Sequence, residues 1–134
     1  MTIPIRKDFT MCGIAGFCNF EYDYTHNPPF YTKLLTDMHD CLSHRGNDQF
    51  GHYLKNTIGL SHAKLNIRNI TNTKQPILYQ FHNREYAIVY DGEIYNTDEL
   101  ITDLKQAGYT FQTASDTEII LYAFLHYGTE FVNN

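Results

Sequence analysis

The sequence lacks the marks of a membrane, secreted or nucleic-acid-binding protein. Its 134 residues hold no run close to the ~18 apolar residues that indicate a membrane span. Residues 1–11 contain Arg6 and Lys7 but no apolar stretch, so they do not form a secretory signal. The formal net charge is -5 and the ten basic residues form no cluster, which argues against nucleic acid and anionic membranes as partners.

Cysteine is scarce. The three cysteines, Cys12, Cys18 and Cys41, are an odd number without repeated spacing, which does not suit a disulfide framework. A reducing, intracellular setting fits better, so we expect a cytoplasmic protein. Cys18 and Cys41 are expected to be thiols of the core.

A recognisable metal-binding pattern is also missing. Cys41 lies near three histidines, but their spacing matches no zinc motif, and surface histidines explain them more simply: His39, His44 and His52. We therefore expect neither a metal nor a cofactor.

The length and the hydrophobic pattern of the chain suit one modest domain, with strands in its first part and helices later. Alternating and apolar stretches predict strands at 12–20, within 50–65, at 77–81 and at 86–90. The last two are joined by a short turn at Asn83-Arg84, and the second is apolar enough to be buried on both faces. A helix is expected from Pro28, with no domain boundary except after residue 11.

Two later helices are predicted from their end signals. Each begins with a capping-box pattern, formed by Asn96 with Glu99 and by Ser115 with Glu118. Each ends at a glycine, the first at Gly108 and the second at Gly128.

Cys12 is the most informative residue because of its place near the start of the chain. It lies in Met11-Cys12-Gly13-Ile14-Ala15-Gly16-Phe17. As the first residue, Cys12 would carry an α-amino group with a pKa of about 7.7–8.0, able to act as base for its own thiol. While residues 1–11 stay attached, that amine is an amide and this chemistry is blocked.

Residues 1–11 are thus an extension or a propeptide, and three explanations stay open. The segment is a cleaved propeptide, the product of a start codon upstream of a true start at Met11, or a retained extension that disables the amine. A small residue such as Cys12 after Met11 suits removal of an initiator methionine.

Four short segments stand out together, with Gln75-Pro76 between them: Cys12–Phe17, His44-Arg45-Gly46-Asn47-Asp48, Asp91-Gly92-Glu93-Ile94-Tyr95-Asn96 and Ser115-Asp116-Thr117-Glu118. In this order they resemble the class II glutamine amidotransferase domain that opens asparagine synthetases. That family begins at a Cys exposed by loss of the initiator Met and shows HRGPD, HRRLSI, QP, NGEIYN and SDTE. The resemblance runs from Met11 to about Gly128.

The resemblance implies a fold and an activity. The fold is the N-terminal-nucleophile sandwich, an α+β αββα arrangement of antiparallel sheets, here expected over 12–134 and truncated at its C-terminus. The activity is hydrolysis of glutamine to glutamate and ammonia through a cysteine thioester. The chain has no Gly-rich phosphate loop, so a synthetase domain or subunit in trans is the partner that the resemblance implies.

By the same resemblance, Cys12 is the nucleophile, and Asp91 and Gly92 occupy the oxyanion positions. The family has Asn where this chain has Asp91, and an ionised Asp offers only acceptors to a forming oxyanion. Loss of one oxyanion donor typically costs ~10²–10³ in rate. We therefore expect impaired catalysis, unless burial keeps Asp91 protonated.

The resemblance also implies three substrate-binding residues. Glu93 and Asp116 correspond to the carboxylates that hold the α-amino group of glutamine, although turn and helix-start roles would explain both. Lys64 stands where the family has an Arg for the α-carboxylate. Because lysine lacks the planar guanidinium fork, weaker glutamine binding is expected.

The departures leave a second function open. The chain is either a glutamine-hydrolysing domain or a degenerate relative that binds or interacts without catalysis. Asp91, Lys64 and the extension of residues 1–11 favour the degenerate relative, whereas Cys12, Gly92, Glu93 and Asp116 favour the enzyme.

Overall fold

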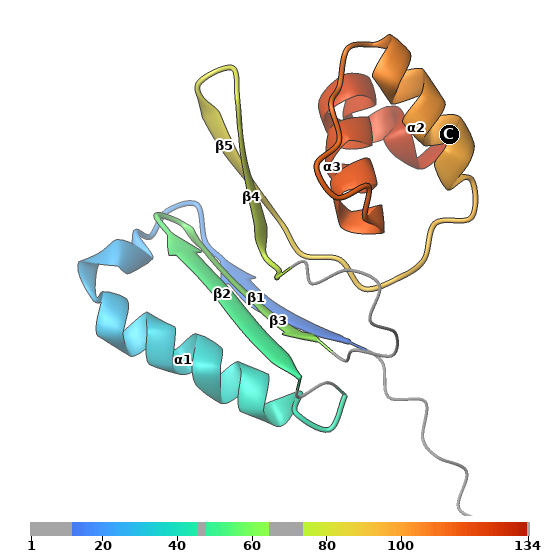
Figure 1. The fold of residues 1–134 in the computed structure, drawn as a ribbon. Coiled ribbons are helices and arrows are strands. Elements are labelled where there is room, and N and C mark those ends of the chain that lie inside the picture. Colours follow the sequence, from blue (N-terminus) through green and yellow to red (C-terminus); the bar gives the residue numbers. More distant parts are fainter. Residues whose placement is uncertain (1–11, 46–47, 65–73, 134) are drawn as a thin grey trace, which may run out of the picture.

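The computed structural model describes residues 12–45, 48–64 and 74–133. Two antiparallel sheets face each other, and helices cover their outer sides (Figure 1). The first part of the chain forms β1 (Gly13–Cys18), η1 (Tyr24–His26), α1 (Pro28–Cys41), β2 (Gln49–Lys55) and β3 (Ile58–Lys64). The second part forms β4 (Ile77–Phe81), β5 (Arg84–Ile88), α2 (Thr97–Gln106), α3 (Asp116–Tyr127) and η2 (Gly128–Asn133).

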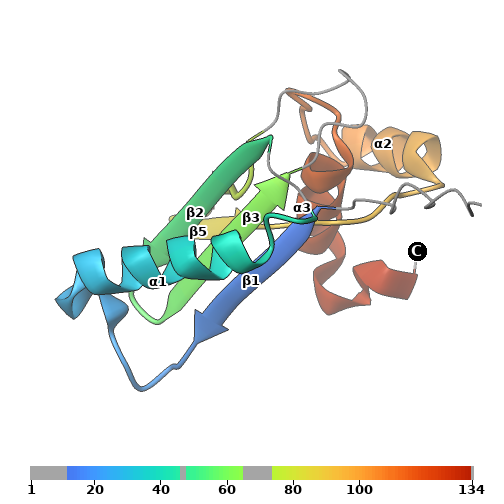
Figure 2. The ribbon, with the colours of Figure 1, turned by 90° about the horizontal axis from the view of Figure 1, so that it is seen from below.

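The three-stranded sheet has the order β1-β3-β2, and α1 crosses its outer face (Figure 2). As predicted, α1 begins with prolines in its first turn, and the Asn27 side chain caps it by accepting from the Phe30 N–H. The helix contributes Leu35, which has 0% of its surface exposed. It also contributes His39, 7% exposed and stacked on Phe50 of β2 with ring centroids 4.2 Å apart. His39 is therefore a core residue, and its predicted surface position was wrong.

The other two cysteines also differ from expectation. Cys18 and Cys41 are both exposed thiols, so the prediction of core positions was wrong. Cys18 ends β1 on a face that α1 does not cover, since the residues alternate along the strand and Phe17 packs beside Tyr31 of α1. Cys41 is the last residue of α1.

The second sheet is the hairpin of β4 and β5. Its turn lies at His82 and Asn83, which have φ of 47° and 60°, one residue earlier than predicted. The strand expected at 86–90 ends at Ile88, and none of its residues is fully buried. Burial on both faces was a wrong prediction: one face of the hairpin packs on α3, and the face toward the other sheet is incompletely covered, with Leu78 52% exposed.

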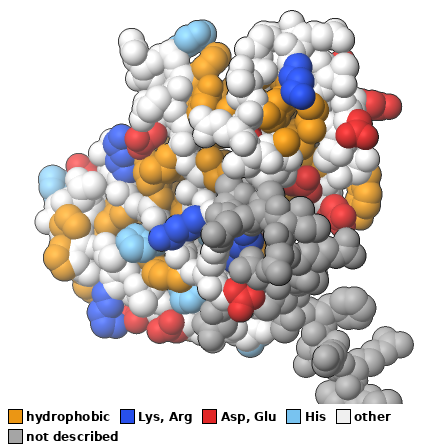
Figure 3. Space-filling model, in the orientation of Figure 1, with side chains coloured by type: hydrophobic (Ala, Val, Ile, Leu, Met, Phe, Trp, Pro, Cys, Tyr) orange, Lys and Arg blue, Asp and Glu red, His pale blue; other side chains and the backbone are white. Residues whose placement is uncertain are grey.

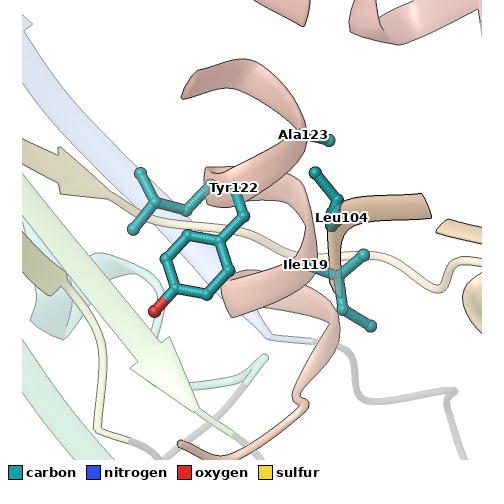
Figure 4. Packing of buried hydrophobic residues seen from close by; sticks show 5 residues of the cluster. Leu104, Ile119, Tyr122 and Ala123 are labelled. Atoms are coloured by element: carbon teal, nitrogen blue, oxygen red, sulfur yellow. The ribbon is translucent and has the colours of Figure 1, made fainter. Parts of the chain in front are cut away.

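The main core lies between α2, α3 and the hairpin (Figure 4). Leu104 of α2 meets Ile119 of α3, and both have 0% of their surface exposed. Tyr122 and Ala123, also of α3, complete the contact at 3% and 2% exposure. The two helices thus bury their apolar contact against each other and against the hairpin.

The two predicted capping boxes have different outcomes. The Ser115 side chain accepts from the Glu118 N–H and caps α3 as expected. Asn96 makes no side-chain cap hydrogen bond at α2, so that prediction was wrong. Its ψ of 36° differs from the extended backbone that orients a capping side chain, whereas Ser115 has ψ 153°.

Glu85 joins the two sheets. Its carboxylate accepts a hydrogen bond of 2.7 Å from the Tyr53 hydroxyl and one of 2.9 Å from Lys55 Nζ, both on β2. The structure is therefore the α+β, αββα-type sandwich of antiparallel sheets that the sequence predicted. Among the described residues, no helix has the length and apolar character needed to cross a membrane.

Candidate active site

Most of the predicted site residues meet in one cavity of about 330 Å³. They come from the start of β1, the end of β3, the segment after β5 and the start of α3, and Figure 1 shows the first three close together. The predicted residues that line the cavity are Cys12, Lys64, Asp91, Gly92 and Asp116. Glu93 is exposed and does not line it.

Cys12 is held by contacts of its own backbone. It directly precedes β1, whose first residue, Gly13, pairs with Ala63 of β3. Arg45 Nε donates a 3.1 Å hydrogen bond to the Cys12 carbonyl. The Arg45 backbone N–H bonds to the Leu42 carbonyl at 2.8 Å, in the turn that follows α1. Cys12, the predicted nucleophile, is therefore held by a strand on one side and an arginine on the other.

Asp91 and Gly92 follow β5 and lie beside the same arginine. Arg45 Nη2 is 3.8 Å from Asp91 Oδ2. At Gly92, an added Cβ would lie only 2.7 Å from the Tyr90 hydroxyl. The Tyr90 hydroxyl therefore packs against Gly92 and would have to shift if this residue had a side chain.

Gln75 holds this segment in place and was not predicted as a site residue. Its Nε2 donates to the Tyr90 carbonyl at 3.1 Å and to Thr117 Oγ1 at 3.0 Å, while its Oε1 accepts from the Tyr90 N–H at 2.6 Å. The backbone of Gln75 is also close to β2, since a Cβ added to Gly51 would collide with the Gln75 carbonyl oxygen. Gln75 thereby ties the segment with the predicted oxyanion residues, Asp91 and Gly92, to α3.

Several other residues of the cavity were missed or given a different role: Gln75, Tyr90, Ala114, Ser115 and Thr117. Gln75 belonged to a recognised motif, which was the available signal, and Ser115 was expected only as a cap. Thr117 also lay within a recognised motif, whereas Tyr90 and Ala114 carried no such signal in the sequence.

Asp116 links α3 to the same segment. Its Oδ2 accepts a 3.0 Å hydrogen bond from the Ile94 N–H. As the first residue of α3, it also lies where the helix dipole favours a negative charge. The carboxylate is therefore fixed at the edge of the cavity.

The cavity separates charges of opposite sign among its lining residues. Lys64 supplies a cationic side chain, and Asp91 and Asp116 supply carboxyl groups. Tyr90 lies among the acidic groups: burial raises its pKa, and the charges of Asp116, Asp91 and Glu93 raise it further. Glu93, although outside the lining, is therefore close enough to influence the site.

Among the described residues, no group of three or more His, Cys, Asp and Glu side chains could hold a metal ion. The extension of residues 1–11 and Asn47 lie outside the described residues.

A larger cavity of about 470 Å³ lies between the tip of the hairpin and the α2–α3 loop, where Figure 3 shows hydrophobic side chains at the surface. Its lining includes Tyr79, Phe81, Tyr109 and Tyr122 but no cysteine. The smaller cavity therefore remains the candidate active site, since it holds Cys12, the predicted nucleophile.

Comparisons with known proteins show the family of the chain. The family model of a glutamine amidotransferase domain matches residues 11–134. Asparagine synthetase [glutamine-hydrolyzing] 1 of Bacillus subtilis is 36% identical over 124 residues, which cover 90% of this chain and 18% of that protein.

Two further relatives have similar coverage. Asparagine synthetase B [glutamine-hydrolyzing] of Escherichia coli is 30% identical over 92% of this chain and 21% of its own length. Amidase chyE of Penicillium rubens is 35% identical over 92% of this chain and 19% of its own length. The chain thus spans about a fifth of these relatives, and by its sequence and its fold it belongs to the class II glutamine amidotransferase domains of the asparagine synthetase type.

Proposed function

We propose that this chain hydrolyses glutamine to glutamate and ammonia through a thioester on Cys12. The observation that carries the proposal is the convergence of Cys12, Gly92, Lys64 and Asp116 on one cavity in a chain of this family. The Cys12 sulfur attacks the side-chain amide carbon, and its proton leaves with the amide nitrogen as ammonia. Water then cleaves the thioester, releasing glutamate and restoring the thiol.

The charges of the cavity support an amino acid as substrate. A free amino acid carries an ammonium and a carboxylate group on the same carbon. Asp116, with Glu93 nearby, suits the ammonium group, and Lys64 suits the carboxylate. The side-chain amide would then extend toward Cys12 and the backbone N–H of Gly92, which is the oxyanion donor.

The ammonia needs an acceptor reaction. Because the relatives are named as glutamine-hydrolysing asparagine synthetases and are about five times longer than the matched part, we infer a synthetase domain or subunit as the consumer. The three free thiols fit a reducing compartment, which supports the cytoplasm as the location.

The test compares the full chain with a form that begins at Met11 and loses this methionine, so that Cys12 is terminal. We expect glutamate release only from the form with a terminal Cys12, because only there is the α-amine free.

A diazo-ketone analogue of glutamine should label Cys12, as measured by the intact mass of the protein. Cys12→Ala should abolish both signals, whereas Cys18→Ala, a change at an exposed thiol at the far end of β1, should keep them. A folded sample with terminal Cys12 that neither reacts nor releases glutamate would contradict the proposal.

A second candidate function is binding without catalysis, and the carboxylate of Asp91 at the oxyanion position favours it. In that case calorimetry would detect glutamine binding by the form with terminal Cys12, while no glutamate would appear. Turnover by this unmodified sequence would reject the second candidate.

A further inference from the structure

Asp91 places a carboxylate where the tetrahedral intermediate develops negative charge. It lines the same cavity as Cys12 and Gly92, and about a fifth of its side chain, 20%, is exposed. Partial burial weakens the screening of charges, so an uncompensated carboxylate would oppose the oxyanion. A working site with this sequence needs a positive charge beside Asp91.

Arg45 is placed to supply that charge. Its Nη2 is 3.8 Å from Asp91 Oδ2, while its Nε donates to the Cys12 carbonyl at 3.1 Å. The guanidinium therefore spans the nucleophile and the oxyanion segment, which are 79 residues apart in the chain. Arginine keeps its charge at every pH that the protein tolerates, and its planar fork can hold both contacts at once.

We propose that Arg45 and Asp91 act as one unit, in which the arginine offsets the carboxylate and leaves the Gly92 N–H free to stabilise the oxyanion. The inference rests on the proposed hydrolysis of glutamine. Arg45 does not line the cavity, so it is a positioning residue that acts through Asp91. Its contribution should therefore depend on which residue occupies position 91.

This dependence separates the proposal from a merely structural role. The hydrogen bond from Arg45 to the Cys12 carbonyl exists whatever the residue at position 91, so losing it would have the same cost in both backgrounds. Charge compensation matters only while Asp91 carries its charge. A double-mutant cycle measures the difference between these two effects.

The experiment compares four proteins with a terminal Cys12: the parent, Arg45→Gln, Asp91→Asn and the double variant. Glutamate release gives kcat and KM for each. We expect Arg45→Gln to lower kcat about 10- to 100-fold in the parent, with little change in KM, because the oxyanion exists only in the transition state. In a protein that already carries Asp91→Asn, Arg45→Gln should lower kcat by less than about threefold.

Two further variants control for folding and for the loss of a surface ion pair. Arg45→Lys retains the charge and should recover part of kcat if charge is what counts. Lys33→Gln breaks the exposed pair of Lys33 with Asp37 on α1, 2.6 Å in length, and should leave kcat unchanged. Circular dichroism and thermal unfolding verify that each variant is folded.

Each failure has its own pattern. If Arg45→Gln lowers kcat by the same factor with Asp91 and with Asn at position 91, or changes KM alone, the proposed pairing of Arg45 with Asp91 is overturned. The proposed hydrolysis of glutamine would still stand. An inactive parent with an active Asp91→Asn variant also overturns the pairing, since Arg45 would then not compensate Asp91. If no variant releases glutamate, the proposed function fails, and this inference fails with it.

Discussion

His62 is buried on β3, close to the residues of the candidate active site. Only 1% of its surface is exposed, and its Nε2 has no hydrogen-bond partner. Burial lowers the pKa of His62, and this effect outweighs a backbone hydrogen bond with Tyr90 and the charge of Asp91, which favour protonation; the charge of Lys64 also lowers it. The imidazole is therefore neutral in the folded protein at pH 7.

This burial predicts a pH dependence of stability. Below about pH 6.5 the unfolded chain binds a proton at His62 that the folded chain does not, so the free energy of unfolding should fall as the pH decreases. The decline continues to the folded pKa, with a slope of at most about 1.4 kcal/mol per pH unit. Urea denaturation between pH 5 and 7.5 measures this decline in the parent and in His62→Gln.

The decline should be smaller in His62→Gln. The matched control is His52→Gln, which changes an exposed histidine in the neighbouring strand and should keep the decline of the parent. Identical pH profiles for the parent and His62→Gln would show that His62 is not its source.

Single residues could be predicted from the sequence only where they belonged to a motif. Cys12, Asp91 and Gly92 were found in this way, and the structure gathers them in one cavity. Gln75 bonds to Tyr90 and to Thr117, which lie 15 and 42 residues away along the chain. Such a bridge depends on the folded arrangement, and one sequence gives no distances between segments.

At the scale of elements, Glu118 shows how a helix start can organise the loop before it. Its carboxylate accepts hydrogen bonds from the N–H groups of Gln112, Thr113 and Ala114, at 2.7–2.8 Å. Burial alone would raise the pKa of Glu118, but these bonds outweigh it and hold the pKa below its ordinary value. Glu118 therefore fixes the 112–114 loop, a role that goes beyond the predicted cap.

Replacing this carboxylate should loosen the loop. In Glu118→Gln the amide group cannot accept all these bonds, so we expect the free energy of unfolding to fall by about 1–3 kcal/mol. Hydrogen exchange should become faster at the three amides. Because the pKa of Glu118 is lowered in the folded protein, its carboxylate contributes to stability above about pH 4.3, and this contribution is lost as the pH falls further. The free energies of unfolding of the parent and of Glu118→Gln should therefore approach each other at low pH.

Glu99→Gln is the control for this prediction. Glu99 has the same place in the other predicted capping box but is exposed in the first turn of α2. A loss of stability as large as that of Glu118→Gln would mean that the loop contacts are not the cause.

The types and approximate bounds of the elements followed from the sequence because they depend on local patterns. The helix expected from Pro28 is α1, and the strands expected within 50–65 are β2 and β3. The errors occurred where backbone angles or neighbouring layers decide the outcome. They include the cap at Asn96 and the burial of β5, since neither the ψ angle of one residue nor the width of a sheet is encoded in a periodicity.

For the whole molecule, the contact between the two sheets is the feature that the sequence could not predict. The described contacts place Glu85 of the hairpin against Tyr53 and Lys55 of β2. Elsewhere the facing strands are less covered, with Ile14 43% and Leu78 52% exposed. We therefore expect the hydrogen bonds of Glu85 to make a measurable contribution to the free energy of unfolding.

This predicts a loss of stability at alkaline pH that depends on Tyr53. Burial, together with the hydrogen bond to Glu85, raises the pKa of Tyr53 to about 12. Above about pH 10 the unfolded chain loses this proton before the folded chain does, so the free energy of unfolding should fall between pH 10 and 12. Tyr53→Phe removes the ionisation and the bond, and at neutral pH it should cost about 1 kcal/mol.

The measurement is urea denaturation from pH 8 to 11 for the parent, Tyr53→Phe and Tyr95→Phe. The advantage of the parent over Tyr53→Phe should shrink as the pH rises past 10, because only the parent must retain a proton on Tyr53 to stay folded. Tyr95 is 91% exposed, so its replacement should leave the profile of the parent unchanged. Parallel profiles for the parent and Tyr53→Phe would show that the Tyr53–Glu85 bond does not govern the alkaline stability of the sandwich.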